Sequence, residues 1–421
     1  MKKRGYGMVK NIEFGIGFLA GRPNVCNIIN CYYKEIVKQG ILDNCQVNFT
    51  IFILFDLNYQ STNREEFYKL DPEVHKYIKI KYITPEDIKQ EKENLVKLYN
   101  ITQDEIDLIL GTGYARARNS IMYFALKNKI DYLLFWDDDE YPIANVKDKE
   151  NNIMWKNQNN ILEHLKNIVN SNVTVGYRCG NMSPIPLIDF DEELKEEDFK
   201  KYIDAVSNEA ISWNKVKEMM NYDNGIKYAN ESILEHKEVQ AIHNLGKENW
   251  LLASGICINL QKIDEVPPFY NPPEARGEDA FFSTWLTNSK VLQIPTYHFH
   301  DSFLKYTDIL NGKYPTKFIK TDIEDNVIEK RFLDASIGWI KYKPLLIYVS
   351  QKDKFEYIMN ETRNRLEESI PKINKVFKNY DFSILLNELE KYNKDVEKHY
   401  QEYLKTYDIW TKIKNEIKKE I

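Results

Sequence analysis

Three consecutive carboxylates follow an apolar segment in the first third of the chain. Residues 132–136 are aromatic or aliphatic, and the acidic triplet, Asp137, Asp138 and Asp139, comes directly after them. This pattern is typical of a buried strand that ends at the edge of an α/β sheet, where ligands bind beside the carboxyl ends of the strands. Adjacent negative charges repel one another, and Mg²⁺ or Mn²⁺ together with substrate phosphates neutralises such a cluster. The triplet therefore predicts a metal–diphosphate site, with a solvated acidic turn as the alternative.

Two arginines stand upstream of the acidic triplet. Arg116 and Arg118, with Asn119 beside them, lie near the start of a helix that we predict over residues 114–128. Helix N-termini favour phosphate groups, and arginine donates paired hydrogen bonds to phosphate oxygens. The alternative is an ordinary salt-bridged helix end.

A second pair of carboxylates, Glu278 and Asp279, follows Gly277 directly. The pair begins a predicted amphipathic helix, whose dipole stabilises negative charge at this end. Helix capping is therefore one interpretation, and a general base that deprotonates an acceptor hydroxyl is the other. Upstream, the small residues Ser254 and Gly255 would let a sugar approach the backbone.

Two histidines alternate near the end of a predicted strand. His298 and His300 share one face because side chains of a strand alternate with a period of two, and Asp301 follows them. An imidazole nitrogen can complete the coordination of a carboxylate-bound Mn²⁺. A metal-ligand role and a structural role both remain open for the two histidines.

The elements that must position these residues alternate between strands and helices. Apolar runs predict strands at 12–20, 47–55, 77–83, 131–136, 172–179, 250–260 and 291–298. Helical spacing of apolar residues is found at 24–39, 114–128 and 158–171. This order predicts a doubly wound α/β domain.

Two regions depart from this alternation. Residues 184–245 contain an acidic stretch at 189–199, and we interpret the region as an insertion that covers the site or contacts a second substrate. A solvated helical excursion is the alternative. The predicted organisation is a domain over 1–305 that carries this insertion, followed by a mainly helical region over 306–421.

The end of the helical region has one continuous apolar face. From Leu385 to Ile421, apolar residues recur in steps of three and four. Such a face packs on its own domain, joins two subunits or lies on a membrane surface. Because the polar face mixes Lys with Glu, the membrane version is disfavoured, and a homo-oligomer formed through these helices remains an expectation.

Composition excludes several classes of protein. The 421 residues carry a net charge of −6 and no dominant basic stripe, so nucleic-acid binding is not expected. Five cysteines without a C-x-x-C pair indicate reduced thiols. No segment has the roughly 18 apolar residues of a membrane span. We expect a cytoplasmic protein, free or bound peripherally at the inner face of the membrane.

The order of these segments resembles the GT-A glycosyltransferases, most closely the inverting family 2 type. That family has an Ala-Arg-Asn segment, a D-x-D motif, a glycine-containing strand and a Glu-Asp motif. The matching residues here are Ala117, Arg118, Asn119, Asp137, Asp138, Asp139, Ser254, Gly255, Glu278 and Asp279. The resemblance implies a Rossmann-like, doubly wound mixed sheet of the GT-A type over about residues 10–302.

The resemblance also implies how a nucleotide-diphosphate sugar would be bound. The loop of Ala20, Gly21 and Arg22 would contact the nucleotide, and Asp56 would recognise its base. Arg118 and Asn119 belong to the donor-binding segment, with Arg118 supporting the diphosphate, and Ser254 and Gly255 lie along the sugar. Asp137 or Asp138 would contact the ribose or the donor sugar.

Metal and catalytic roles follow from the same resemblance. Asp139 would bind Mn²⁺ or Mg²⁺, with either His298 or His300 as a further ligand. Asp279 would deprotonate the acceptor hydroxyl, with Glu278 as the alternate base, and the anomeric centre would be inverted. The acceptor would be a glycan, a lipid-linked sugar or a protein, most simply in the assembly of cell-surface glycans.

The chain departs from the family in three places. Residues 56–61 lack the usual Asp-Gly-Ser run, the insertion at 184–245 is long, and a Q/R-x-x-R/W motif is absent, which argues against a processive synthase. A sugar-phosphate nucleotidyltransferase is an alternative, but Gly15, Gly17 and Gly21 match its glycine-rich loop poorly. A two-metal phosphatase or nuclease leaves the Glu-Asp pair unexplained. The last alternative is a scaffold with a degenerate transferase domain and a helical interaction region.

Overall fold

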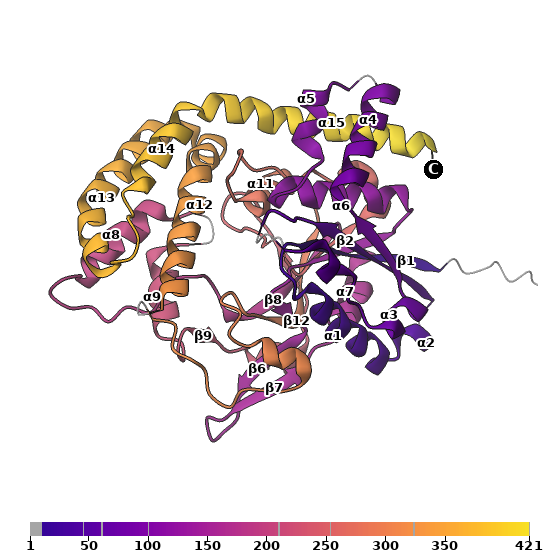
Figure 1. The fold of residues 1–421 in the computed structure, drawn as a ribbon, viewed down its shortest axis with the longest axis horizontal. Helices are drawn as coiled ribbons and strands as arrows, with labels where there is room; N and C mark the ends of the chain where they lie inside the picture. Colours follow the sequence, from indigo (N-terminus) through magenta and orange to yellow (C-terminus); the bar gives the residue numbers. More distant parts are fainter. Residues whose placement is uncertain are drawn as a thin grey trace, which may run out of the picture.

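A mixed β-sheet forms the centre of the molecule. The computed structural model describes residues 11–44, 46–59, 62–99, 101–208, 211–252, 254–322 and 325–420. Within them, ten strands form one sheet, in which β10-β12-β8-β11-β4-β1-β2-β3 is the order of the main path. Helices cover the sheet, and a separate group of helices lies beside it (Figure 1). The predicted α/β class is confirmed.

The first half of the sheet is parallel. Its strands are β1 (Ile12–Ala20), β2 (Val47–Phe55), β3 (Lys79–Ile83) and β4 (Tyr132–Trp136). β1 pairs in parallel with both β2 and β4. These strands lie where the sequence predicted them, because buried parallel strands are nearly continuous apolar runs.

The second half makes the sheet mixed. Its main strands are β8 (Val173–Asn181), β11 (Ile256–Asn259) and β12 (Val291–His300). β11 runs antiparallel to its neighbours β4 and β8, whereas β12 pairs in parallel with β8. The carboxyl ends of β1, β2, β4, β8 and β12 therefore meet at one edge of the sheet, and the residues just before β11 arrive at that same edge.

Short strands complete the sheet and its surroundings. β5 (Glu140–Tyr141) and β10 (Gln240–Ile242) pair with β12, and β9 (Ile226–Lys227) pairs with β8. β6 (Ile143–Lys147) and β7 (Ile153–Asn157) form a separate hairpin. The later part of the predicted insertion is thus attached to the far edge of the sheet.

Helices bury both faces of the sheet. One face is covered by α1 (Val25–Lys38), α2 (Ile41–Asn44), η1 (Arg64–Tyr68), α3 (Pro72–Tyr77) and α7 (Asn160–Ile168). The other is covered by α4 (Pro85–Tyr99), α5 (Gln103–Ile109), α6 (Tyr114–Lys127), η2 (Leu260–Glu265), α11 (Glu278–Trp285) and α15 (Val396–Glu420). The apolar strands between them are shielded on both sides, as a largely parallel sheet requires.

The group of helices beside the sheet joins two distant parts of the sequence. It contains α8 (Glu196–Val206), α9 (Trp213–Met220), α12 (Asn326–Ser350), α13 (Phe355–Val376) and α14 (Ile384–Lys394). The ring of Tyr202 in α8 lies 5.8 Å from that of Phe332 and 5.9 Å from that of Phe382. The first part of the insertion and the C-terminal region therefore share one core, which we call the helical layer (Figure 1). Smaller elements are α10 (Glu231–His236), η3 (Thr307–Asn311) and η4 (Lys352–Lys354).

The apolar face at the end of the chain is buried on this same chain. It is divided at Asp395 into α14 and α15. In α15, Trp410 is fully buried, and its indole nitrogen donates to the carbonyl of Val266 at 3.0 Å. The buried part of this apolar face is thus not available to a second subunit. An oligomer formed through these helices stays a prediction, and this face does not support it. In the described part of the chain, no helix has the length and apolarity needed to cross a membrane.

Candidate functional site

A pocket of about 300 Å³ lies at the edge of the sheet where the strand ends meet. Its floor comes from the ends of β1, β2, β4 and β12, and its sides come from the N-termini of α6 and α11. A further wall comes from α12 of the helical layer. Ligands of α/β sheets bind at such an edge, because the loops there converge from several strands.

Most of the residues predicted for the site line this pocket. They are Gly21, Arg22, Asp56, Arg118, Asp137, Asp138, Asp139, Ser254, Glu278, Asp279 and His300. Asp56 also accepts a hydrogen bond from the backbone of Gly113 at 3.1 Å, which ties the end of β2 to the start of α6.

Four predicted site residues lie outside the pocket lining. Ala20 is buried at the end of β1. Asn119 exchanges two hydrogen bonds with the backbone of Phe269, at 2.8 and 2.9 Å, and so holds a loop. Gly255 has φ +63°, and a Cβ there would lie 2.6 Å from the ring of His298. His298 is itself buried under this glycine.

Arg22 holds two members of the acidic triplet. Its guanidinium contacts the carboxylate of Asp138, and its NH1 lies 3.0 Å from Oδ2 of Asp139. Burial would raise the pKa of Asp139, but the charges of Arg22 and His300 outweigh it and hold that pKa below its ordinary value. For Asp138, burial wins and raises the pKa to about 6. Asp139 is therefore the more firmly ionised of the two.

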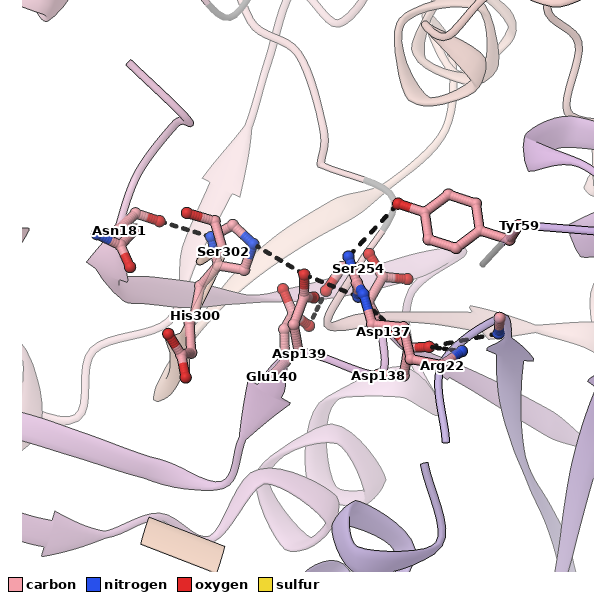
Figure 2. A network of polar contacts seen from close by, with 12 residues as sticks. Arg22, Tyr59, Asp137, Asp138, Asp139, Glu140, Asn181, Ser254, His300 and Ser302 are labelled. Carbon is pink, nitrogen blue, oxygen red and sulfur yellow. Dashed lines mark hydrogen bonds and ion pairs between the residues drawn. The ribbon is translucent and has the colours of Figure 1, made fainter. Parts of the chain in front are cut away.

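His300 reaches Asp139 from the other side (Figure 2). Its Nδ1 lies 2.5 Å from the carbonyl oxygen of Asn181 and so donates to it, which leaves Nε2 as a free acceptor 3.8 Å from Oδ2 of Asp139. Burial, and then the charge of Arg178, lower the pKa of His300 to about 4, so its imidazole is neutral near pH 7. A backbone carbonyl that accepts from one ring nitrogen, and so fixes the tautomer, is typical of a metal-binding histidine.

These two side chains fit a divalent cation. One carboxylate and one imidazole would leave the remaining positions to diphosphate oxygens, as is common for Mg²⁺ and Mn²⁺ sites. The described residues contain no group of three or more His, Cys, Asp and Glu side chains arranged to hold a metal by themselves. A cation at Asp139 and His300 would thus depend on a phosphate-bearing partner.

Arg118 connects the acidic triplet to the second carboxylate pair. Its NH2 donates to Asp137 at 3.0 Å, and its Nε lies 3.5 Å from Glu278. The side chain is only 3 % exposed, and its Nε and NH1 lack a hydrogen-bond partner. Buried donors without partners at the edge of a pocket favour an anionic ligand.

Glu278 and Asp279 begin α11, as predicted. Gly277 precedes them with φ +92°, and a Cβ there would lie 2.7 Å from the ring of Tyr342 in α12. Burial, together with the charge of Asp279, raises the pKa of Glu278 to about 7. Burial also raises the pKa of Asp279, which has no cation within ion-pair distance among the described residues. Asp279 accepts the backbone N–H of Ala280 at Oδ1, at 2.9 Å, and is the carboxylate of the two without an ion pair among the described residues.

Glu140 is a buried residue of the site that sequence reasoning missed. It accepts hydrogen bonds from the hydroxyl of Ser254 and from Arg178, the latter at 2.9 Å, and lies 3.3 Å from Nε2 of His298. Burial would raise the pKa of Glu140, but His298 and Arg178 outweigh it and lower the pKa to about 2. Two signals were present: a fourth acidic residue follows the triplet, and Arg178 interrupts an apolar strand.

The wall from α12 was also missed. Arg331, Trp339 and Tyr342 line the pocket from this helix, and Arg276 lies against Gly338 of the same helix. No local pattern pointed to them, because α12 is apolar on several sides and lies far from the motifs in sequence. Their place in the pocket depends on how the helical layer packs against the sheet.

No protein-family model matches the chain, and no curated protein is similar to it in sequence. The chemistry of the site therefore rests on its own geometry. Buried arginines, an ionised carboxylate beside a neutral imidazole, and an unpaired carboxylate meet in one pocket, which suits a phosphorylated substrate and a proton transfer.

Proposed function

We propose that the chain is an inverting glycosyltransferase of the GT-A type that uses a nucleotide-diphosphate sugar and a divalent cation. One observation carries the proposal: the acidic triplet, the loop of Gly21 and Arg22, the Glu278–Asp279 pair and His300 line a single pocket. These segments lie at the carboxyl edge of a mixed sheet in which one antiparallel strand, β11, separates two parallel parts. The resemblance to the GT-A enzymes leads us to expect these motifs in this order along the chain and together at this edge of the sheet.

The nucleotide is assigned to the part of the pocket at the ends of β1 and β2. Asp56 lies there with Tyr59 and the start of α6, where Gly113 and Tyr114 line the pocket. A carboxylate and aromatic rings suit a base and ribose, because rings stack and a carboxylate accepts hydrogen bonds from ring N–H and hydroxyl groups. The diphosphate then lies next to Arg22 and Arg118.

Arg118 and a cation held by Asp139 and His300 would both stabilise the leaving group. Bound at Asp139 and His300, Mn²⁺ or Mg²⁺ would neutralise the charge that develops on the departing nucleoside diphosphate. Arg118 is already oriented by Asp137 and Glu278, so it needs little rearrangement to donate to phosphate. We assign Asp137 and Asp138 to contacts with the ribose or the donor sugar.

Asp279 is assigned as the base for the acceptor hydroxyl. Proton removal is efficient when the pKa of the base lies near the working pH, and burial moves the pKa of Asp279 upward. Glu278, whose pKa is raised to about 7, is the alternate base, but Arg118 lies 3.5 Å from its carboxylate and would compete with the acceptor hydroxyl for it. The acceptor that we propose is a hydroxyl of a glycan, a lipid-linked sugar or a protein, in the setting of cell-surface glycan assembly.

The test is a panel of UDP-, GDP-, CMP- and dTDP-sugars, each with and without Mn²⁺. We expect one nucleotide class to raise the melting temperature and to be hydrolysed slowly, in both cases only when Mn²⁺ is present. Binding stabilises the folded chain by an amount that rises with the logarithm of ligand concentration over its dissociation constant, so the shift reports affinity. A chain that responds to no member of the panel with either Mn²⁺ or Mg²⁺ would contradict the proposal.

A further inference from the structure

Arg22 contacts the carboxylate oxygen of Asp139 that a bound metal ion would need as a ligand. Its NH1 is 3.0 Å from Oδ2 of Asp139, and this same oxygen faces Nε2 of His300 at 3.8 Å. Figure 2 shows Asp139 between His300 and the guanidinium group. A guanidinium and a divalent cation cannot share this oxygen cheaply, because two positive charges a few ångströms apart repel strongly in a poorly hydrated pocket.

The arginine is held in this place by several contacts. Its backbone N–H donates to Oδ2 of Asp138 at 3.0 Å, and its side chain is fixed by the Asp138 carboxylate. The ring of Tyr59 lies 5.4 Å from the guanidinium, and the Tyr59 hydroxyl lies 3.4 Å from NH2. Arg22 is only 5 % exposed. Moving it away without another anion would leave a buried charge unpaired, which is strongly unfavourable.

We propose that Arg22 is an internal counter-ion that keeps the metal out until a nucleoside diphosphate arrives. This inference rests on the proposed function. The diphosphate supplies the anion that a displaced guanidinium requires, since arginine pairs with phosphate oxygens through two parallel hydrogen bonds. Arg22 then turns from Asp139 to the phosphate, and Oδ2 becomes free for the cation. Metal and nucleotide therefore bind as a coupled pair, and the metal alone binds weakly.

The coupling between metal binding and nucleotide binding is reciprocal, and its usual size sets the change in affinity that we expect. Coupling free energies between two ligands commonly change each affinity about 5- to 150-fold, and each ligand strengthens the other by the same factor. We expect Mn²⁺ to bind the full chain at least about tenfold more tightly with nucleotide than without it. In Arg22→Gln, Mn²⁺ alone should bind about tenfold more tightly than to the wild type, because the competing charge is gone.

The experiment is a Mn²⁺ titration of the full chain, read by the loss of the free-Mn²⁺ signal in electron paramagnetic resonance. It is done alone and with UDP, GDP, CMP and dTDP, with a protein-free titration to correct for Mn²⁺–nucleotide complexes. The matched control is Arg363→Gln, which removes an equal charge from α13, where the Arg363 side chain is 43 % exposed and lies 3.3 Å from the Glu390 carboxylate. Arg363 does not line the pocket, so this variant should change Mn²⁺ affinity by less than about threefold.

The outcomes separate the inference from the function. If a nucleotide binds with Mn²⁺ but a folded Arg22→Gln chain binds Mn²⁺ alone no better than wild type, the counter-ion role is wrong and the proposed function stands. If no nucleotide is bound with or without Mn²⁺, the proposed function is wrong as well. Should Arg22→Gln fail to fold, Arg22→Lys replaces it. A single ammonium cannot span both carboxylates, so Mn²⁺ alone should bind more tightly than to wild type, and unchanged affinity would overturn the inference.

Discussion

The carboxylates of the pocket differ in whether an arginine side chain forms an ion pair with them. Arg22 and Arg118 hold the three members of the acidic triplet. Asp279 has no ion pair among the described residues, although it lies only one residue from Glu278, which Arg118 approaches at 3.5 Å. The free carboxylate is the one that can take up a proton without first losing a partner. The division of roles that we propose for the two acidic motifs rests on this difference.

Replacing Asp279 by Asn should strongly lower the rate of sugar transfer and leave donor binding nearly intact. Loss of a general base typically lowers the rate about 10²- to 10⁴-fold, whereas the neutral amide keeps the size of the side chain. Transfer rate and donor dissociation constant are the two measurements. Asp104→Asn is the matched control, because Asp104 lies in the first turn of α5 and does not line the pocket. Full transfer by Asp279→Asn would refute the base assignment.

Replacing Glu278 by Gln should stabilise the protein at alkaline pH. The pKa of Glu278 is raised from 4.5 to about 7, so between these pH values the folded chain keeps a proton that the unfolded chain has lost. The protonated Glu278 carboxyl therefore stabilises the folded chain at low pH. This stabilisation is lost as pH rises from about 4.5 to 7. The variant should gain on the order of 2 kcal/mol in unfolding free energy at pH 8 relative to its effect at pH 4.5.

Urea unfolding at pH 4.5 and at pH 8 measures this gain. Glu192→Gln is the control, because the Glu192 side chain is 96 % exposed and a change there should stay within about 0.5 kcal/mol at both pH values. An equal effect of Glu278→Gln at the two pH values would show that Glu278 titrates normally.

The junction between α11 and α12 is the contact that positions the Glu-Asp pair. Gly277 precedes α11 with positive φ, and the Tyr342 ring of α12 occupies the space that a side chain would take. A short helix end is otherwise a weak support for catalytic residues, since helix termini fray. Close packing against a long helix keeps the carboxylates in place relative to the acidic triplet.

Gly277→Ala should therefore lower the rate of sugar transfer by more than its loss of folding stability would explain. Any residue with a Cβ pays about 1–2 kcal/mol at positive φ, and here the new methyl group would also meet Tyr342 and shift the carboxylates. Gly312→Ala is a matched control: Gly312 has φ +75°, but no atom lies within 4 Å of its added Cβ. We expect similar backbone strain in both variants and at least a tenfold loss of transfer only in Gly277→Ala. Equal transfer rates in the two would argue against this contact.

The whole molecule consists of the sheet with its helices and of the helical layer that closes one side of the pocket. The layer includes residues from the insertion and from the C-terminal region, which meet in one apolar core. Its helix α12 also supplies pocket residues. The boundary predicted at residue 305 thus passes between segments that pack together, so the two predicted regions depend on one another.

A chain shortened to residues 1–305 should not fold as a soluble monomer. It would lose the partners of Phe199 and Tyr202 in α8, namely Phe332 and Phe382. Large exposed apolar surfaces lead to association or aggregation. The readouts are sedimentation and binding of a hydrophobic dye, and co-expression with residues 306–421 should restore solubility. A monomeric fragment with a cooperative unfolding transition would contradict the shared core.

The sequence by itself determined the α/β class, the parallel strands β1, β2, β3 and β4, and eleven of the residues that line the pocket. Those features depend on local patterns: apolar runs produce buried strands, and polar residues at their carboxyl ends reach a common edge. Tertiary structure decided which histidine faces the pocket. Alternation placed His298 and His300 on one face, but His298 lies deeper along β12, under Gly255, whereas His300 reaches the edge.

Tertiary structure also decided the partners of the charged groups and the far wall of the pocket. The contact of Arg22 with Asp139 spans more than a hundred residues, and the wall from α12 depends on aromatic packing with α8. No local period encodes such contacts, because they form only when separate apolar surfaces bury one another. The residue types of the site can therefore be found in the sequence, whereas their pairing and enclosure are properties of the folded chain.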